Sequence, residues 1–180
     1  MICGLKCVNR AWGCILGMRV DKSEDCSHSR CMAIVDRSTV LEASADVVWA
    51  AVKTPAAFRT VTRGILSMPV IRTRTEEWRE GETVIGWVFL FGLLPFSRHH
   101  LHVARVDDSS RTLRSREFGG LITMWNHDIE VEPIDAVSCR YRDRIEIRAG
   151  IFTPLIVIYA KWFYRMRQRR WRALAKGLGK

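Results

Sequence analysis

The chain has 180 residues, of which 48% are hydrophobic and 27% charged, and this composition fits one globular domain large enough to enclose a small-molecule cavity. It excludes a second full domain and bulk disorder. Most of the formal net charge of +10 lies in residues 151–180, which carry eight basic side chains and no acid, whereas residues 32–150 contain sixteen of each sign. The most apolar run, residues 84–96, has thirteen residues and contains two glycines and a proline, so it is too short for the roughly twenty residues of a membrane-spanning helix.

Five of the six cysteines lie within residues 1–31, and only Cys139 belongs to the rest of the chain. The body, residues 32–180, is therefore typical of a reduced compartment and predicts a cytoplasmic protein. Cys26, His28 and Cys31 are metal-binding residue types, but they lack the paired CxxC spacing of zinc modules, so no metal is predicted. Residues 1–31 do not resemble a signal peptide. We interpret them as a flexible Cys-rich extension, or as the product of a start codon assigned upstream of Met32.

The patterned part of the chain begins with a predicted strand over residues 35–43. Ser44 can then cap a helix that extends to about Lys53, with Asp46 in its first turn, where the helix dipole favours an acid. Thr54 and Pro55 predict a second short helix that ends before Gly64. Two short helices therefore follow the first strand.

Short strand-like runs separated by turn residues follow these helices and predict an antiparallel meander. The predicted strands are residues 65–75, 83–91, 99–106, 112–118, 122–132 and 137–149. Thr153 and Pro154 then open a long C-terminal helix with a cap and a proline. The fold class is thus α+β, with a curved antiparallel sheet of about seven strands wrapped on the long helix.

The long helix is amphipathic, and its apolar stripe is predicted to cover the concave face of the sheet. That stripe comprises Leu155, Ile158, Tyr159, Trp162, Phe163, Met166, Ala173 and Leu174. Basic residues recur on the opposite side, and they could contact an anionic membrane. These are Lys161, Arg165, Arg169, Arg172 and Lys176.

Four segments resemble those of the START-like (SRPBCC) superfamily, which includes polyketide cyclases and has the helix-grip fold. They are VLEASADVVW at residues 40–49, WREGE at 78–82, WNHDI at 125–129 and YRDRIE at 141–146. The resemblance covers residues 34–175 and implies a cavity for a hydrophobic ligand, with residues 91–96 at its mouth. The side chains expected to line it are Trp87, Phe89, Phe91, Leu101, Val103, Leu113, Trp125, His127, Tyr141, Asp143, Leu155, Ile158, Tyr159 and Trp162.

Alternation along the two late strands places His127, Tyr141 and Asp143 on the inward face. A turn near Ile134 and Asp135 predicts that His127 lies beside Tyr141, with Asp143 one diagonal step away. Two interpretations stay open. The three groups could bind a polar ligand head or transfer a proton, or they could only satisfy one another's hydrogen bonds.

Other polar residues give weaker signals. Glu117 shares the face of Leu113 and Ser115 but lies near a Gly-Gly turn, which favours solvation. His99, His100 and His102 cannot all reach one metal ion, because successive strand residues point to opposite faces. The sequence contains no nucleophile elbow, phosphate-binding loop or dinucleotide fingerprint, so no cofactor is predicted.

Three hypotheses for function follow. The first is a binding or carrier protein for a lipid, an isoprenoid or a polyketide-like molecule, which best explains the fold and the inward aromatic residues. The second is a cyclase or dehydratase in which His127, Tyr141 or Asp143 moves a proton. The third is binding of an anionic membrane or of nucleic acid through the basic helix face, although the sequence contains no pattern of a specific nucleic-acid module.

Overall fold

The computed structural model describes residues 32–178, so the predictions for residues 1–31 lie outside the described part of the chain. One seven-stranded antiparallel sheet has the strand order β1-β7-β6-β5-β4-β3-β2. The strands are β1 (Ala33–Leu41), β2 (Leu66–Ser67), β3 (Thr83–Leu90), β4 (Leu94–Asp107), β5 (Thr112–Gly119), β6 (Ile122–Pro133) and β7 (Cys139–Arg148). The helices are α1 (Ala45–Val52), α2 (Pro55–Thr62), the 3₁₀ turns η1 (Pro69–Ile71) and η2 (Gly150–Phe152), and the long α3 (Thr153–Leu178).

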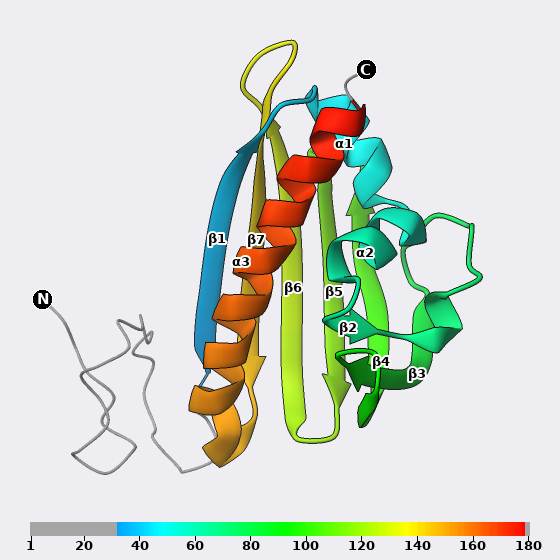
Figure 1. The fold of residues 1–180 in the computed structure, drawn as a ribbon, viewed down its shortest axis with the longest axis vertical. Coiled ribbons are helices and arrows are strands. Elements are labelled where there is room, and N and C mark those ends of the chain that lie inside the picture. Colours follow the sequence, from blue (N-terminus) through cyan, green and yellow to red (C-terminus); the bar gives the residue numbers. More distant parts are fainter. Residues whose placement is uncertain (1–31, 179–180) are drawn as a thin grey trace, which may run out of the picture.

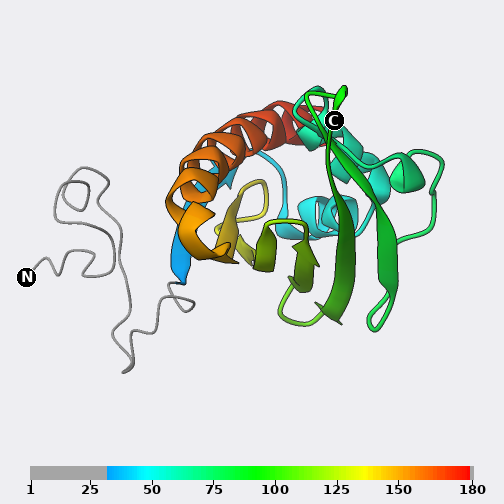
Figure 2. The same cartoon turned by 90° about the horizontal axis from the view of Figure 1, so that it is seen from below.

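The sheet curls, and α3 lies across its concave side (Figures 1 and 2). The predicted α+β class and helix-grip architecture are confirmed, including the two short helices after the first strand. Because an antiparallel sheet with one apolar face must bury that face, the helix provides the second layer of the domain. No helix within residues 32–178 is long and apolar enough to span a membrane.

The helix starts follow local capping chemistry. The Thr54 hydroxyl accepts a hydrogen bond from the Ala57 amide at 3.2 Å, and Pro55 occupies the first turn of α2, where its missing N–H costs nothing. Ser44 precedes α1 as predicted, but its side chain makes no capping bond and only its carbonyl accepts from Val48, at 3.1 Å. Thr54 is therefore the side-chain cap that was predicted for α2. Ser44 has the predicted position before α1, but its side chain does not cap the helix.

The early strands differ most from the prediction. The strand expected over residues 65–75 is only two residues long in the structure, since Pro69 lacks an amide donor and begins η1 instead. β4 begins at Leu94, five residues before the predicted start at His99. Residues 94–98 thus form the second strand of a hairpin whose tip, at Phe91 and Gly92, has positive φ angles of 54° and 74°.

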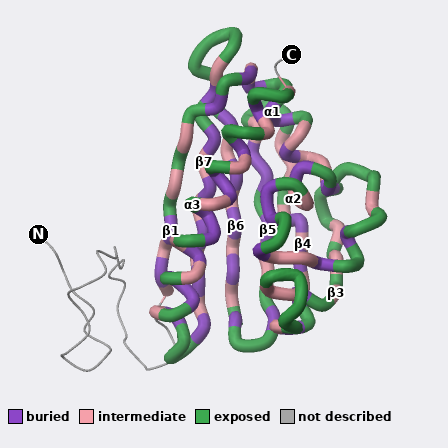
Figure 3. The backbone as a smooth tube through the Cα atoms, viewed as in Figure 1, coloured by how far each residue is buried: buried purple, intermediate pink, exposed green. Residues whose placement is uncertain are grey.

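The β6–β7 hairpin keeps the predicted faces but not the predicted register. His127 pairs with Ile145, not with Tyr141, because the connecting loop is centred near residue 136. The Asp135 carboxylate accepts from the Val137 amide at 2.9 Å and stabilises this longer loop. Since the register differs by an even number of residues, each side chain stays on its predicted face, and burial alternates along both strands (Figure 3).

Helix α3 is rotated relative to the predicted apolar stripe. Leu155, Ile158 and Trp162 are 64%, 48% and 40% exposed, whereas the buried face includes the polar residues Arg167 and Gln168. The predicted stripe was therefore correct for Phe163, but Leu155, Ile158 and Trp162 lie at the exposed edge of the buried face, and Arg167 and Gln168 were missed because the stripe was defined by apolar residues. The buried residues of α3 are Thr153, Ile156, Val157, Ala160, Phe163, Tyr164, Arg167, Gln168, Trp171 and Ala175.

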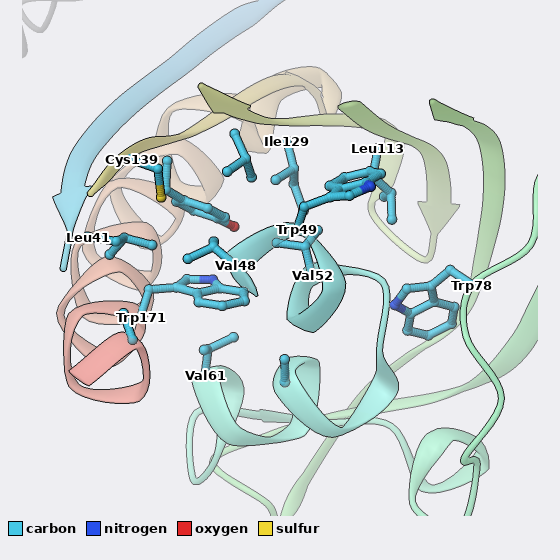
Figure 4. Packing of buried hydrophobic residues seen from close by; sticks show 14 of the residues in the cluster. Leu41, Val48, Trp49, Val52, Val61, Trp78, Leu113, Ile129, Cys139 and Trp171 are labelled. Carbon is cyan, nitrogen blue, oxygen red and sulfur yellow. The ribbon is translucent and has the colours of Figure 1, made fainter. Parts of the chain in front are cut away.

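Two apolar clusters fill the space between the layers. One packs α1, α2 and the C-terminal half of α3 on the sheet, with Trp49 and Trp171 among its largest members (Figure 4). The other packs the N-terminal half of α3 on β1, β6 and β7 around Phe163 and Tyr164. Burying each of these large side chains contributes roughly 1.5–3 kcal/mol, so α3 is held firmly at both ends.

Candidate functional site

A cavity of about 540 Å³ lies between the concave face of the sheet and the first half of α3. Its walls are mainly apolar and come from α2, strands β2 to β6 and α3. Four lining side chains, Phe91, Leu155, Ile158 and Trp162, are also 40–64% exposed, so they mark the mouth. The ring centroids of Phe91 and Trp162 lie 6.2 Å apart, which joins the β3–β4 turn to α3. The volume falls in the range of about 300–1,000 Å³ that is usual for small-molecule sites.

Polar side chains line the same cavity at positions remote from bulk water. His99, His127 and Arg167 are 8%, 6% and 5% exposed, and the Glu117 side chain is 13% exposed. Charged groups are almost never buried unless they are paired. Each of these four is paired, so the cavity combines an apolar wall with a few fixed polar groups.

Asp143 is the centre of a buried hydrogen-bond network behind His127 and Arg167. Its Oδ1 atom lies 2.8 Å from His127 Nε2, and it accepts a hydrogen bond from the Tyr141 hydroxyl at 2.9 Å. Arg167 donates from Nη2 to the Tyr141 hydroxyl at 3.0 Å, and its Nε is 3.4 Å from Asp143 Oδ1. Asp143 and Tyr141 are fully buried and do not line the cavity, so they support the two groups that do.

The protonation states in this network follow from burial and pairing. Burial raises the pKa of Tyr141 far above its usual value, and the nearby Asp143 adds to this effect, so the phenol keeps its proton. Burial opposes the charged form of Arg167, but Tyr141, Asp143 and Tyr164 hold its pKa above the ordinary value. Arg167 is thus a permanent buried cation at the wall of the cavity.

His127 is the group in this network that could exchange a proton with a ligand. A carboxylate only accepts hydrogen bonds, so Nε2 carries the hydrogen that is donated to Asp143, and Nδ1 is the ring nitrogen left to face a ligand. Nδ1 has no hydrogen-bond partner within residues 32–178. The Tyr164 ring packs edge-on against the imidazole at 5.2 Å and fixes its orientation.

Glu117 forms a second polar pair in the cavity wall. His99 Nε2 lies 3.0 Å from one carboxylate oxygen, and the Ser115 hydroxyl donates to the other at 2.5 Å. Burial alone would raise the pKa of Glu117, but the bonds from His99 and Ser115 hold it below its usual value. The expectation that Glu117 is solvated was therefore wrong, because Glu117 lies opposite the buried Leu101 in the sheet and its carboxylate contacts the buried His99 side chain.

The three histidines of β4 have separate partners. The His100 ring stacks on Phe118 at 4.5 Å, and His102 Nδ1 lies 2.9 Å from the Thr83 hydroxyl. Within the described residues there is no group of three potential metal ligands among His, Cys, Asp and Glu side chains.

The structure brings eight of the residues predicted to bind ligand to the cavity wall and places six elsewhere. Those at the wall are Phe91, Leu101, Trp125, His127, Leu155, Ile158, Tyr159 and Trp162. Val103 and Leu113 face inward but belong to the cluster under α1, and Tyr141 and Asp143 form the network behind the wall. Trp87 and Phe89 lie on the outer side of β3, where the neighbouring Val88 and Leu90 line the cavity instead.

Arg167 is the main residue that sequence reasoning missed. It stands in a run of arginines, so composition assigns it to the solvent side of α3. The available signal was spacing, since Arg167 follows the buried Phe163 and Tyr164 by four and three residues and therefore shares their face. Glu117 was assigned to the face of Leu113 and Ser115, and His99 was considered only as part of a rejected metal cluster, so their pairing was not expected.

The basic residues predicted on the outer side of α3 are mostly exposed. Arg165, Arg169, Arg172 and Lys176 are exposed on α3, and Lys161 is partly exposed. Lys176 Nζ lies 3.8 Å from a Glu42 carboxylate oxygen. Arg165, Arg169 and Arg172 border a separate hollow between α3 and β1.

A family model described as "Domain of unknown function (DUF8410)" matches residues 39–175. No curated protein matches the chain. A START superfamily protein from Mycobacterium smegmatis is similar in structure, with a TM-score of 0.63, 11% identity and coverage of 81% of this chain and 98% of that one.

Two enzymes also share the fold. The Zhui aromatase/cyclase from Streptomyces sp. R1128 has a TM-score of 0.61 at 12% identity, with 81% of this chain and 94% of that chain covered. Norcoclaurine synthase from Thalictrum flavum, in complex with dopamine and hydroxybenzaldehyde, has a TM-score of 0.59 at 16% identity, with 83% and 89% covered. At these identities the likeness establishes the START-like fold, in agreement with the resemblance of the four sequence segments.

Proposed function

The chain belongs to the DUF8410 family, and we propose that it is a binding or carrier protein for a hydrophobic small molecule held in the cavity under α3. The observation that supports this most directly is the cavity itself, about 540 Å³ of mainly apolar wall that also carries Arg167 and His127. Such a site is suited to a ligand with an apolar body and one polar oxygen group. Arg167 would donate to that oxygen, and Nδ1 of His127 would accept from it where it is a hydroxyl, while the wall excludes water from the rest of the molecule.

The lipid, isoprenoid or polyketide-like ligand would enter past Phe91, Leu155, Ile158 and Trp162. These side chains are exposed at the mouth although they are large and apolar, and exposed apolar patches commonly mark binding sites. A cytoplasmic location, which the single cysteine of residues 32–180 favours, is part of the same proposal.

The test is a pair of matched tryptophan substitutions. Val88→Trp adds volume to a buried residue of the cavity wall, whereas Val40→Trp makes the same change at a residue that is 52% exposed on β1. Binding of an apolar fluorescent probe should be lost in Val88→Trp and retained in Val40→Trp. Equal binding by both folded variants would contradict the proposal. Native mass spectrometry of protein from its own host would then identify a co-purifying ligand.

A second candidate is a cyclase or dehydratase, and the specific observation that favours it is His127 with an unbonded Nδ1 in the cavity wall. Nδ1 would take the proton next to a carbonyl group and return it to a departing hydroxyl, so that a double bond forms and water leaves. Tyr141 and Asp143 would only orient His127. If His127→Asn and wild type converted candidate hydroxy-ketone substrates at the same rate, with probe binding intact, this candidate would be excluded.

The basic face of α3 extends the proposal to peripheral contact with an anionic membrane. Arg165, Arg169 and Arg172 are exposed there, and basic side chains near a surface of anionic lipid each contribute about 1 kcal/mol. Retention on anionic vesicles should fall as salt is raised. Retention that is unaffected by salt would count against this electrostatic contact.

A further inference from the structure

A second hollow, of about 420 Å³, lies between α3 and the edge strand β1. It is lined by Arg37 and Ser38 of β1 and by Arg165, Gln168, Arg169 and Arg172 of α3. We call it the arginine groove. The four helix residues are spaced by three, one and three positions, so they share one side of α3. No residue lines both the groove and the apolar cavity.

Charge in the arginine groove is unbalanced. The lining contains four guanidinium groups and no carboxylate. Within residues 32–178, neither Arg37, Arg165 nor Arg169 forms an ion pair, and Arg172 donates only to the neutral Thr39 hydroxyl, at 2.8 Å. Like charges gathered in this way repel one another, so a bound anion would remove an unfavourable interaction.

Some arginines elsewhere on the same sheet do form ion pairs, unlike those of the arginine groove. Arg142 of β7 donates to both oxygens of Asp36, at 2.9 and 2.6 Å, and also to Glu130 at 3.1 Å. Arg116 of β5 donates to Asp128 at 2.8 Å. Arg116 and Arg142 on the convex face are thus neutralised by acids, whereas the arginines that line the groove form no ion pair within residues 32–178.

Two donors in the arginine groove are buried and have no partner. They are Arg37 Nε and Gln168 Nε2, and Gln168 as a whole is only 5% exposed. Arg37 shares the inward side of β1 with the buried Val35 and Leu41, so its side chain runs beneath α3. Buried donors are normally satisfied, and leaving one unpaired is costly. These two donors lie beside the positively charged hollow, and a small rearrangement of either side chain would let it reach an acceptor there.

We propose that the arginine groove binds a phosphomonoester dianion. Four planar guanidinium forks and one amide offer more donors than the two oxygens of a carboxylate can accept, whereas a phosphoryl group presents three oxygens and nearly two charges. The same group occurs on soluble phosphorylated metabolites and on the headgroup of phosphatidic acid. The site is separate from the apolar cavity and does not depend on the ligand proposed there.

The test uses the full chain and two double variants of equal charge. Arg37→Gln with Arg169→Gln removes one arginine from each wall of the groove. Arg63→Gln with Arg98→Gln is the control, since both residues are exposed and neither lines the groove. Affinity for inorganic phosphate and for glycerol 3-phosphate is measured calorimetrically at constant ionic strength. We expect the groove variant to bind about tenfold to a hundredfold more weakly than wild type, and the control to bind like wild type.

Vesicles of phosphatidylcholine with and without phosphatidic acid then distinguish the two sources. Groove-dependent retention on phosphatidic acid supports a lipid headgroup, and groove-dependent binding of glycerol 3-phosphate without retention supports a soluble metabolite. The proposal is overturned if neither probe binds, if chloride at the same ionic strength competes as well as phosphate, or if both variants lose affinity equally. Groove-dependent binding of an oligonucleotide but of neither monoester also overturns it, because a phosphodiester carries a single charge. None of these outcomes affects the test with Val88→Trp.

Discussion

Arg167 and Arg169 lie two residues apart on α3, yet the first is buried and paired and the second is exposed without an ion pair within residues 32–178. Arg167 is 5% exposed and is held by Tyr141 and Asp143 at the wall of the apolar cavity. Arg169 is exposed in the arginine groove and has no ion pair within residues 32–178. The cavity therefore contains charges that are already balanced, which suits a mostly neutral ligand, while the groove presents charge that only an external anion can balance.

The largest expected effect is the difference in unfolding free energy between variants of the buried Arg167 and of the exposed Arg169. Arg167→Leu leaves Asp143 buried without its cation, so we expect the free energy of unfolding to fall by about 3–5 kcal/mol. Arg169→Leu should change it by no more than about 0.5 kcal/mol. Urea unfolding followed by fluorescence measures both. Similar losses in the two variants would show that the buried pair has no special role, and Arg167→Leu combined with Asp143→Leu should recover part of the loss.

Tyr141→Phe tests the buried hydrogen-bond network of Tyr141, Asp143 and Arg167 behind the cavity wall. The substitution removes a hydroxyl that donates to Asp143 and accepts from Arg167, and it should destabilise the fold by about 1–3 kcal/mol. Because Tyr141 does not line the cavity, probe affinity should stay close to that of wild type. His127→Phe is the matched comparison, because His127 lines the cavity. This substitution should lower the affinity for ligands with a polar oxygen. A large affinity loss in Tyr141→Phe would place the hydroxyl in direct ligand contact.

Glu117→Gln should produce a smaller effect that depends on pH. The pKa of Glu117 is below its ordinary value of 4.5 in the folded protein, so the unfolded state binds more protons as pH falls. The stability that the charge contributes is therefore fully present above pH 4.5 and is lost as pH falls below that value. The difference in unfolding free energy between wild type and Glu117→Gln should narrow over this acidic range. A difference that stays constant with pH would mean that the carboxylate is not stabilised by His99 and Ser115.

The smallest expected effect is the dependence of the unfolding free energy on salt, which should differ when the arginine groove is altered. With no phosphate present, added sodium chloride screens repulsion among unpaired arginines, so it should stabilise wild type slightly more than the Arg37→Gln/Arg169→Gln variant. The expected difference is a few tenths of a kcal/mol, typical of exposed charges. Thermal unfolding at low and high salt measures it, and the Arg63→Gln/Arg98→Gln variant should respond more like wild type. An identical response of all three proteins would indicate that the groove arginines do not repel one another.

The sequence allowed the architecture to be predicted well because its signals are local. Thr54 and Pro55 mark the start of α2, and alternation identified the inward faces of β6 and β7. Errors arose where a particular side-chain hydrogen bond decided the outcome. The register of the β6–β7 hairpin depends on how Asp135 shapes its loop, and the partner of Glu117 is eighteen residues away, on the neighbouring strand.

The functional surfaces depended more strongly on tertiary structure. Helical spacing from Phe163 and Tyr164 places Arg167 on the buried face of α3, but it does not identify Asp143 and Tyr141 of β7 as the groups that pair with it there. Nor could it show that Arg165, Arg169 and Arg172 meet Arg37, which is more than one hundred residues earlier in the chain.

By itself, then, the sequence determined the order of elements, the helix-grip fold and the concentration of positive charge in the last helix. Those features depend on capping, alternation and composition, which act over a few residues. Only the tertiary structure decided which arginine is paired in the interior and which, within residues 32–178, meet in the arginine groove without an ion pair. Burial and ion pairing depend on side chains from separate elements meeting in space, and no local pattern encodes that meeting.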